Sequence, residues 1–200
     1  DRLDHIVARM AAYEPGNGAD ALRGDHQLSP HLKPSPPWTQ AAVLVPLIDH
    51  NDGLTVLLTR RTDHLTDHPG QISFPGGRFE SGDVDAEAAA LRETEEELGI
   101  PRARVELLGR LDTYITRTGF DVTPIVGVIT PPFSLRPDSF EVADVFEVPL
   151  AFLIDPGNYM REERLGDDRA TYYYAVPYED RYIWGATAGM LKNLCEALGD

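Results

Sequence analysis

The sequence predicts one main domain of the α/β class, of the mixed α+β kind, in which a mixed β-sheet is flanked by helices. First, the chain of 200 residues is 42% hydrophobic, which suits one core of ordinary size with a small appendage. Second, runs rich in β-branched and apolar residues, typical of strands, recur along the chain. Third, the helical segments between them follow no regular βαβ repeat, which favours a mixed sheet over a parallel one.

Residues 1–38 are predicted to form a helical extension followed by a proline-rich connector. The first residues carry apolar side chains at steps of three to four, which indicates a helix that ends before Gly16-Asn17-Gly18. Four prolines between Leu28 and Trp38 prevent helix continuation and favour an extended chain. We therefore expect the main domain over residues 39–200. Residues 1–38 are compatible with a cover for the core, a contact in a homodimer, or a plain extension, and their composition favours none of the three.

The main domain begins with a predicted β-hairpin. Ala41–Ile48 and Leu54–Thr59 have strand composition, and the Asn51-Asp52-Gly53 segment between them is a turn signal. The same criteria predict further strands at Ile72–Phe74, Val105–Tyr114, Val122–Thr130, Val145–Pro149 and Tyr172–Val176, with an extended segment at Tyr182–Trp184. Helical patterns predict helices over residues 85–98, 149–154 and 186–198.

Composition excludes several classes of partner. Eighteen basic against thirty-three acidic residues give a net charge of −15, which opposes binding to nucleic acid or to an anionic membrane surface. No apolar run reaches the roughly 18 residues needed to span a bilayer, and no secretory leader pattern is present. The single cysteine, Cys195, excludes an internal disulfide, so we expect a cytoplasmic protein. Such a protein can still bind a phosphorylated small molecule if divalent cations and local arginines reverse the potential in a pocket.

The segment from Phe74 to Ile100 predicts a loop, a helix and a second loop. Asp83 or Asp85 can cap the helix, and Gly99 ends it. Three glutamates lie at positions i, i+3 and i+4, so their carboxylates share one face of the helix: Glu93, Glu96 and Glu97. Hard divalent cations such as Mg²⁺ or Mn²⁺ take carboxylate oxygens and accept phosphate oxygens in their remaining positions. An acidic helical face is more often plain solvated surface, but Gly76-Gly77 before it permits close approach of a ligand.

These residues resemble the signature of the Nudix hydrolases. Gly77 and the run Arg92-Glu93-Thr94-Glu95-Glu96-Glu97-Leu98-Gly99-Ile100 match it, although the spacing from glycine to arginine is one residue longer than usual and Asp83 stands where glutamate is usual. The resemblance implies an α/β/α sandwich with a catalytic loop-helix-loop. It also implies that Glu93, Glu96 and Glu97 hold divalent ions, and that a metal-bound water attacks phosphorus.

Further roles rest on the same resemblance. Glu141 is our candidate for the proton acceptor, since it lies in a family-like segment. Arg60, which follows a predicted strand, is our candidate for binding phosphate oxygens, with Arg61 beside it, although arginines after strands are more often surface charges. Gly76 and Gly77 are expected to border the substrate.

A second set of residues is similar to the coenzyme A pyrophosphatase branch of that family. The set comprises Leu57-Leu58-Thr59-Arg60-Arg61-Thr62, Gly70 and Phe74-Pro75-Gly76-Gly77, while Thr62 and Thr66 depart from the branch pattern. The resemblance implies hydrolysis of coenzyme A or its derivatives to 3′,5′-ADP and 4′-phosphopantetheine. A Nudix hydrolase acting on ADP-ribose or a dinucleotide is the near alternative. A non-catalytic module that senses a nucleotide is the alternative from another class, and a plain acidic structural protein is a third.

The remaining chemically active side chains favour structural roles. His64 and His68 lack a nearby cysteine or glutamate partner for a zinc site. Tyr172, Tyr173 and Tyr174 could stack on an adenine, but tyrosines in a strand more often pack the sheet. Cys195 lies on an apolar helical face, which indicates packing and not nucleophilic chemistry.

Overall fold

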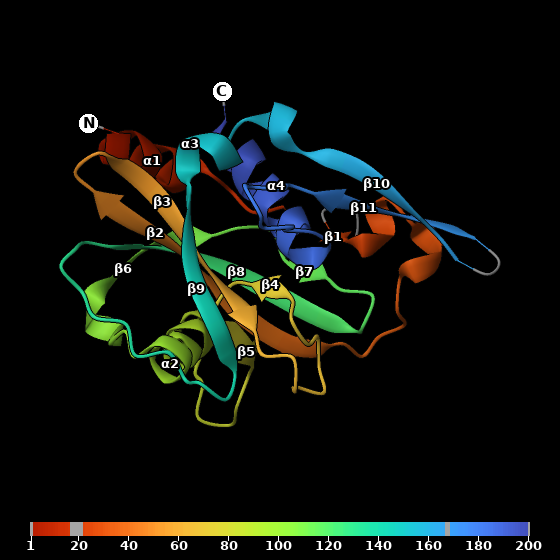
Figure 1. The fold of residues 1–200 in the computed structure, drawn as a ribbon, viewed down its shortest axis with the longest axis horizontal. Helices are drawn as coiled ribbons and strands as arrows, with labels where there is room; N and C mark the ends of the chain where they lie inside the picture. The colour runs from red at the N-terminus through yellow and green to blue at the C-terminus, as the bar shows by residue number, and fades with distance from the viewer. Residues whose placement is uncertain (1, 17–21, 167–168, 200) are drawn as a thin grey trace.

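A mixed β-sheet lies between two layers of helices in the computed structural model, which describes residues 2–16, 22–166 and 169–199 (Figure 1). This confirms the predicted fold class. The helices are α1 (Arg2–Ala12), α2 (Ala86–Leu98), α3 (Leu150–Leu153) and α4 (Ala186–Leu198), with short 3₁₀ turns η2 (Asp25–Gln27), η3 (Pro30–Leu32), η4 (Arg102–Arg104) and η5 (Pro156–Asn158). The strands are β1 (Arg23–Gly24), β2 (Thr39–His50), β3 (Gly53–Arg61), β4 (Ile72–Ser73), β5 (Gly76–Arg78), β6 (Val105–Arg110), β7 (Tyr114–Ile115), β8 (Phe120–Ile129), β9 (Val142–Pro149), β10 (Met160–Leu165) and β11 (Ala170–Ala175).

Strand β2 is the centre of the sheet. It pairs in parallel with β8 from Thr39 opposite Phe120 to Ile48 opposite Ile129, and antiparallel with β3 through the predicted hairpin. The order of the main path is β1-β7-β8-β2-β3-β4, while β5 pairs with β2, β6 with β8 and β9 with β3. Strands β10 and β11 form a separate antiparallel hairpin that projects from the body.

Alternation along β2 separates the two sides of the core. Ala42 and Leu44 pack with alanines of α2, whereas Ala41, Val45 and Leu47 belong to the larger cluster that includes α1, α3 and α4. Because successive side chains of a strand point to opposite faces, this period of two lets a single strand serve both layers. Each fully buried leucine contributes about 1.5–3 kcal/mol, so the centre of the sheet is the most stable part of the platform for α2.

The segment before Thr39 packs onto the same core. Ile6 and Met10 of α1 are buried in the larger cluster, and β1 pairs in parallel with β7. Ser29 is buried, and its hydroxyl accepts a hydrogen bond from the Tyr172 N–H and donates one to the carbonyl of the same residue. Asn17 and Gly18 of the predicted turn lie outside the described residues.

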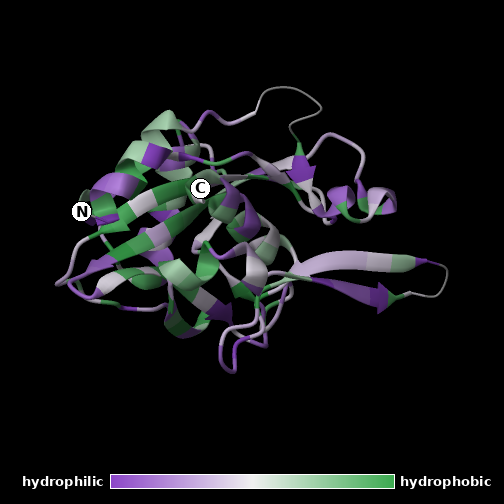
Figure 2. Cartoon of the chain, turned by 90° about the horizontal axis from the view of Figure 1, so that it is seen from above, coloured by the Kyte–Doolittle hydropathy of each residue, from purple (hydrophilic) through white to green (hydrophobic). Residues whose placement is uncertain are grey.

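One strand prediction is corrected, and three strands were not predicted, namely β1, β5 and β10. The strand predicted over Val105–Tyr114 is two strands, β6 and β7. Both β6 and β7 pair with β8, which carries Pro124 between the two paired stretches. Proline has no N–H to donate, so the two segments are linked at Pro124 by the hydrogen bond from the Leu111 N–H to the Pro124 carbonyl. Strand β10 was not predicted, because its sequence Met-Arg-Glu-Glu-Arg-Leu is mostly charged; Figure 2 shows it largely in the hydrophilic colour.

The remaining differences are small. Strand β9 begins at Val142, three residues before the predicted start, and α3 lies within the predicted 149–154 range. The expected extended segment at Tyr182–Trp184 makes a bridge between Trp184 and Ala175. In the described part of the chain, no helix is both long and apolar enough to cross a membrane.

Candidate functional site

Helix α2 has the boundaries that its sequence predicts. Asp85 is the N-cap, and its carboxylate accepts a hydrogen bond from the Ala88 N–H at 2.8 Å. Gly99 ends the helix in the left-handed conformation, at φ 69°, which glycine adopts without steric cost. Alanines on one side of the helix pack on the sheet, which fixes the rotation of α2 and therefore the direction of its glutamates.

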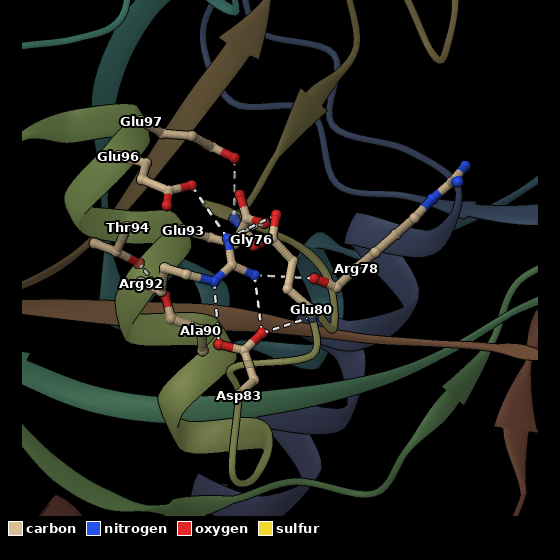
Figure 3. A network of polar contacts seen from close by, with 10 residues as sticks. All are labelled: Gly76, Arg78, Glu80, Asp83, Ala90, Arg92, Glu93, Thr94, Glu96 and Glu97. Atoms are coloured by element: carbon tan, nitrogen blue, oxygen red, sulfur yellow. Dashed lines mark hydrogen bonds and ion pairs between the residues drawn. The ribbon is translucent and has the colours of Figure 1, made fainter.

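Arg92 gathers the acidic side chains at the start of the site (Figure 3). Its Nη1 donates to Glu93 at 2.9 Å and to Glu96 at 3.1 Å, and its Nε and Nη2 donate to the two carboxylate oxygens of Asp83. Nη2 also donates to the Arg78 carbonyl at 3.0 Å. The hydrogen bonds from Arg92 lower the pKa of Asp83, so both groups are charged at neutral pH. Asp83, one of two predicted caps, instead ties the loop before α2 to Arg92.

Glu97 lacks such compensation. Its side chain is 6% exposed, and one oxygen accepts a long hydrogen bond, 3.4 Å, from the Gly76 N–H. Burial, and next the negative charge of Glu93, raise the pKa of Glu97 to about 8. Burial also raises the pKa of Glu93, although Arg92 opposes that shift. A buried carboxylate with a raised pKa is a place where a bound cation would be strongly favoured.

The donor chemistry at α2 fits a hard divalent cation. Glu93, Glu96 and Glu97 offer carboxylate oxygens, the ligands that Mg²⁺ and Mn²⁺ take. Among the described residues, however, no three His, Cys, Asp or Glu side chains already converge on one point suited to a metal ion. Arg92 accounts for part of this, because it draws Glu93 and Glu96 toward itself.

The space between β2 and the helix glutamates is too small for a side chain, and Gly76 and Gly77 occupy it. A Cβ on Gly77 would lie 2.5 Å from Oε1 of Glu93, and one on Gly76 would overlap the backbone of Ala42 and Val43 in β2. The two glycines therefore let strand β5 approach both the sheet and α2 closely.

The structure brings Glu141 near this cluster. Its carbonyl accepts a hydrogen bond from the Thr62 N–H at 2.9 Å, at the end of β3, and its charge raises the pKa of both Glu93 and Glu97. The two neighbouring arginines of β3 differ. Arg60 lies 3.9 Å from Asp63, whereas Arg61 lines a cavity beside the site and its charge acts on Glu97.

The cavity has a volume of about 310 Å³ and begins at Gly76 and Gly77. Such a volume is within the usual range for small-molecule sites. Its lining includes four arginines, which is unusual for a chain with a net charge of −15. These arginines come from four separate elements of the sequence, namely Arg61, Arg78, Arg117 and Arg164. Only the first was singled out from the sequence, because no local pattern joins the other three.

The other side chains considered from the sequence have varied surroundings. The His64 ring lies 4.7 Å from the Phe140 ring, and His68 lines the cavity. Tyr172 and Tyr173 line the cavity too, whereas Tyr174 packs against the core. Cys195 is buried, its thiol donates to the Ile154 carbonyl at 3.3 Å, and burial raises its pKa, which disfavours a reactive thiolate.

Comparison with known proteins gives the class and then the family. The NUDIX domain model matches residues 38–158, more than half the chain, and this range contains the entire loop-helix-loop. Fold and site thus define a hydrolase of pyrophosphate bonds. The chain belongs to the Nudix hydrolase family.

Relatives of the same family match almost the whole chain. The uncharacterized Nudix hydrolase NudL of Escherichia coli O139:H28 (strain E24377A / ETEC) is 42% identical over 200 residues, covering 98% of this chain and 95% of its own. NudL of Enterobacter sp. (strain 638) is 41% identical over 199 residues, with the same shares. The crystal structure of the Nudix hydrolase RenU from M. Smegmatis has a TM-score of 0.54 at 17% identity over 79% of this chain and 84% of its own, a likeness of fold alone.

Proposed function

We propose that this protein hydrolyses the pyrophosphate bond of coenzyme A or of its derivatives, with Mg²⁺ or Mn²⁺, to 3′,5′-ADP and 4′-phosphopantetheine. One observation carries the proposal: a buried glutamate that forms no ion pair among the described residues, Glu97, lies next to the glycines that border an arginine-lined cavity. The carboxylates suit a divalent ion, and the arginines suit a polyanionic substrate. The similarity of residues 57–77 to the coenzyme A branch supports this substrate over others.

The residues of the acidic cluster have separate proposed roles. Glu93, Glu96 and Glu97 would hold the metal, which when bound stabilises negative charge on the pyrophosphate and makes water a better nucleophile at neutral pH. Arg92 positions Glu93 and Glu96 through its hydrogen bonds. Glu141 is our proposed proton acceptor, since its charge acts on both Glu93 and Glu97.

We propose that the phosphates of the substrate bind in the cavity that Gly76 and Gly77 border. Arg61 replaces Arg60 as our proposed phosphate ligand, because Arg61 lines the cavity and Arg60 faces Asp63. Arg78 lines the cavity as well, and Figure 3 shows its guanidinium pointing away from the glutamates. Gly76 and Gly77 let the substrate approach the backbone closely.

The test is product analysis with purified protein. Coenzyme A, ADP-ribose and NADH are incubated separately with Mg²⁺ or Mn²⁺, and products are resolved by chromatography, with chelator-treated samples as blanks. We expect 3′,5′-ADP and phosphopantetheine to form fastest and to disappear with chelator. Glu97→Gln should lower kcat by at least about 100-fold, whereas Glu95→Gln, an exposed position on the same helix, should retain activity.

Three other outcomes have distinct meanings. Faster cleavage of ADP-ribose or NADH would refute coenzyme A as the preferred substrate while leaving the pyrophosphohydrolase assignment in place. Tight binding of a nucleotide with no turnover of any substrate would favour the sensing role. Equal activity of Glu97→Gln and the native protein would refute the role of the helix carboxylates.

A further inference from the structure

The arginines of the cavity fall into two pairs with different surroundings. The inner pair, Arg61 and Arg78, belongs to strands β3 and β5 beside the glutamate helix. The outer pair, Arg117 and Arg164, belongs to the loop between β7 and β8 and to the projecting hairpin. Figure 1 shows that this hairpin extends from the side of the molecule away from α2. The two pairs therefore come from different elements of the fold, and the outer pair lies on elements other than those beside the glutamate helix.

Neither guanidinium group of the outer pair has a carboxylate partner among the residues that the structure describes. Neither Arg117 nor Arg164, both exposed, forms an ion pair within 4 Å to a carboxylate of the described residues, whereas Arg78 of the inner pair lies 3.8 Å from Asp67. Asp25 also lines the cavity, but both of its carboxylate oxygens accept hydrogen bonds from other groups, namely the Tyr114 hydroxyl and the Arg117 backbone N–H. Two guanidinium groups that line one cavity and have no ion pair among the described residues are well suited to the planar, bidentate binding of a phosphate group.

Aromatic side chains line the same cavity, and two of them belong to the hairpin that carries Arg164. Tyr172 and Tyr173 of β11 line it together with Trp184, and the rings of Tyr173 and Trp184 lie edge to face at 5.3 Å. Flat rings of this kind bind nucleobases by stacking, typically with about 1–3 kcal/mol per base. Aromatic rings and two arginines without an ion pair among the described residues, all lining one cavity, match a nucleoside that carries its own phosphate.

Residues before position 38, where the family match begins, hold in place the outer wall of the cavity, which comprises Arg117, Arg164, Tyr172, Tyr173 and Trp184. Ser29 makes both of its side-chain hydrogen bonds to the backbone of Tyr172, and Asp25 fixes the backbone of Arg117 at 2.7 Å. Neither Ser29 nor Asp25, and neither Tyr172 nor Arg164, lies within residues 38–158. The outer wall is thus built largely by segments added to the common family core.

We propose that Arg117 and Arg164 form a second anion subsite, which binds a phosphate monoester on the ribose of the substrate's nucleoside while the nearby aromatic rings contact the base. The choice of a phosphorylated nucleoside rests on the proposed function, but the subsite itself rests on the cavity. The subsite makes the enzyme select substrates whose nucleoside carries a phosphate in addition to the pyrophosphate that is cut.

Binding to metal-free protein tests the subsite without turnover. Adenosine 3′,5′-bisphosphate and 5′-AMP are titrated by calorimetry in the presence of EDTA, with native protein, Arg117→Gln, Arg164→Gln and the double variant. Arg110→Gln is the control, since Arg110 is exposed on β6 and does not line the cavity. We expect native protein to bind the bisphosphate at least about tenfold more tightly than AMP, because charge-assisted hydrogen bonds contribute that much. The double variant should lose this preference and keep its affinity for AMP within about twofold.

The same preference should appear in catalysis. Native enzyme with Mn²⁺ should give a lower KM for coenzyme A than for dephospho-coenzyme A. The double variant should equalise the two KM values, whereas Arg110→Gln should keep the native difference. An unchanged preference for the bisphosphate in the double variant, or no preference in native protein, would overturn the subsite. Failure to cleave either compound, with the binding preference intact, would instead refute the proposed function and leave the subsite standing.

Discussion

Replacing Glu97 by glutamine should stabilise the metal-free protein at alkaline pH. Burial raises the pKa of Glu97 from 4.5 to about 8 in the folded state, so the folded state holds a proton that the unfolded state releases. The stability that this proton gives is complete below pH 4.5 and is lost as pH rises toward 8. At about 1.4 kcal/mol per pH unit, the native protein loses up to about 4 kcal/mol by pH 8, and glutamine loses none.

Urea unfolding in EDTA at pH 5, 7 and 8.5 measures this difference. The Glu97→Gln variant should match native protein at pH 5 and exceed it by about 2–4 kcal/mol at pH 8.5. Adding Mn²⁺ at pH 8.5 should stabilise native protein and have much less effect on the variant. Glu95→Gln is the control, because Glu95 is exposed on the same helix. A difference that does not change with pH, or a variant less stable than native protein at pH 8.5, would refute the electrostatic account of Glu97.

Four further substitutions test other contacts. Gly77→Ala should cut kcat by at least about tenfold with a stability loss under about 2 kcal/mol, because its Cβ displaces only the Glu93 side chain. Gly76→Ala should instead lower the urea concentration at which the protein unfolds, because its Cβ meets the backbone of β2. Urea unfolding and steady-state kinetics of both variants check these results. Ser29→Ala should cost about 1–2 kcal/mol and raise KM more than it lowers kcat, as steady-state kinetics would show, since it releases the Tyr172 backbone. Arg92→Lys should lower stability by about 2–4 kcal/mol and kcat with it, because lysine cannot reproduce the paired bonds to Asp83; an unchanged thermal midpoint would contradict this.

Local signals made the acidic helix predictable. Asp85 caps α2 and Gly99 ends it, and both effects depend only on neighbouring residues. The grouping of Glu93, Glu96 and Glu97 follows from helical periodicity in the same way. Sequence alone could not show that Glu97 is buried and Glu96 is exposed, because the difference depends on strand β5, which packs against α2.

Long-range contacts explain what was missed. Arg117 and Arg164 are 47 positions apart in the numbering and reach one cavity only through the folding of β8 and the hairpin. Strand β10 has the composition of an exposed surface and lacks the β-branched and aromatic residues that favour a strand. It is held as a strand by its pairing with β11, which carries the tyrosines. The assignment of Arg60 or Arg61 to phosphate binding stays a prediction, and sequence alone does not show the register shift between them, which changes the pairing of β3 with β9.

The parallel pairing of β2 with β8 also sets when the protein can fold during synthesis. Thr39 and its partner Phe120 are about 80 positions apart, and β2 is one of the most apolar strands of the core. At roughly 5–20 residues per second, a ribosome needs several seconds to add the missing strand. Until then the hairpin of β2 and β3 has an open edge and two apolar faces, so we expect a nascent chain that ends before Ile129 to be prone to aggregation.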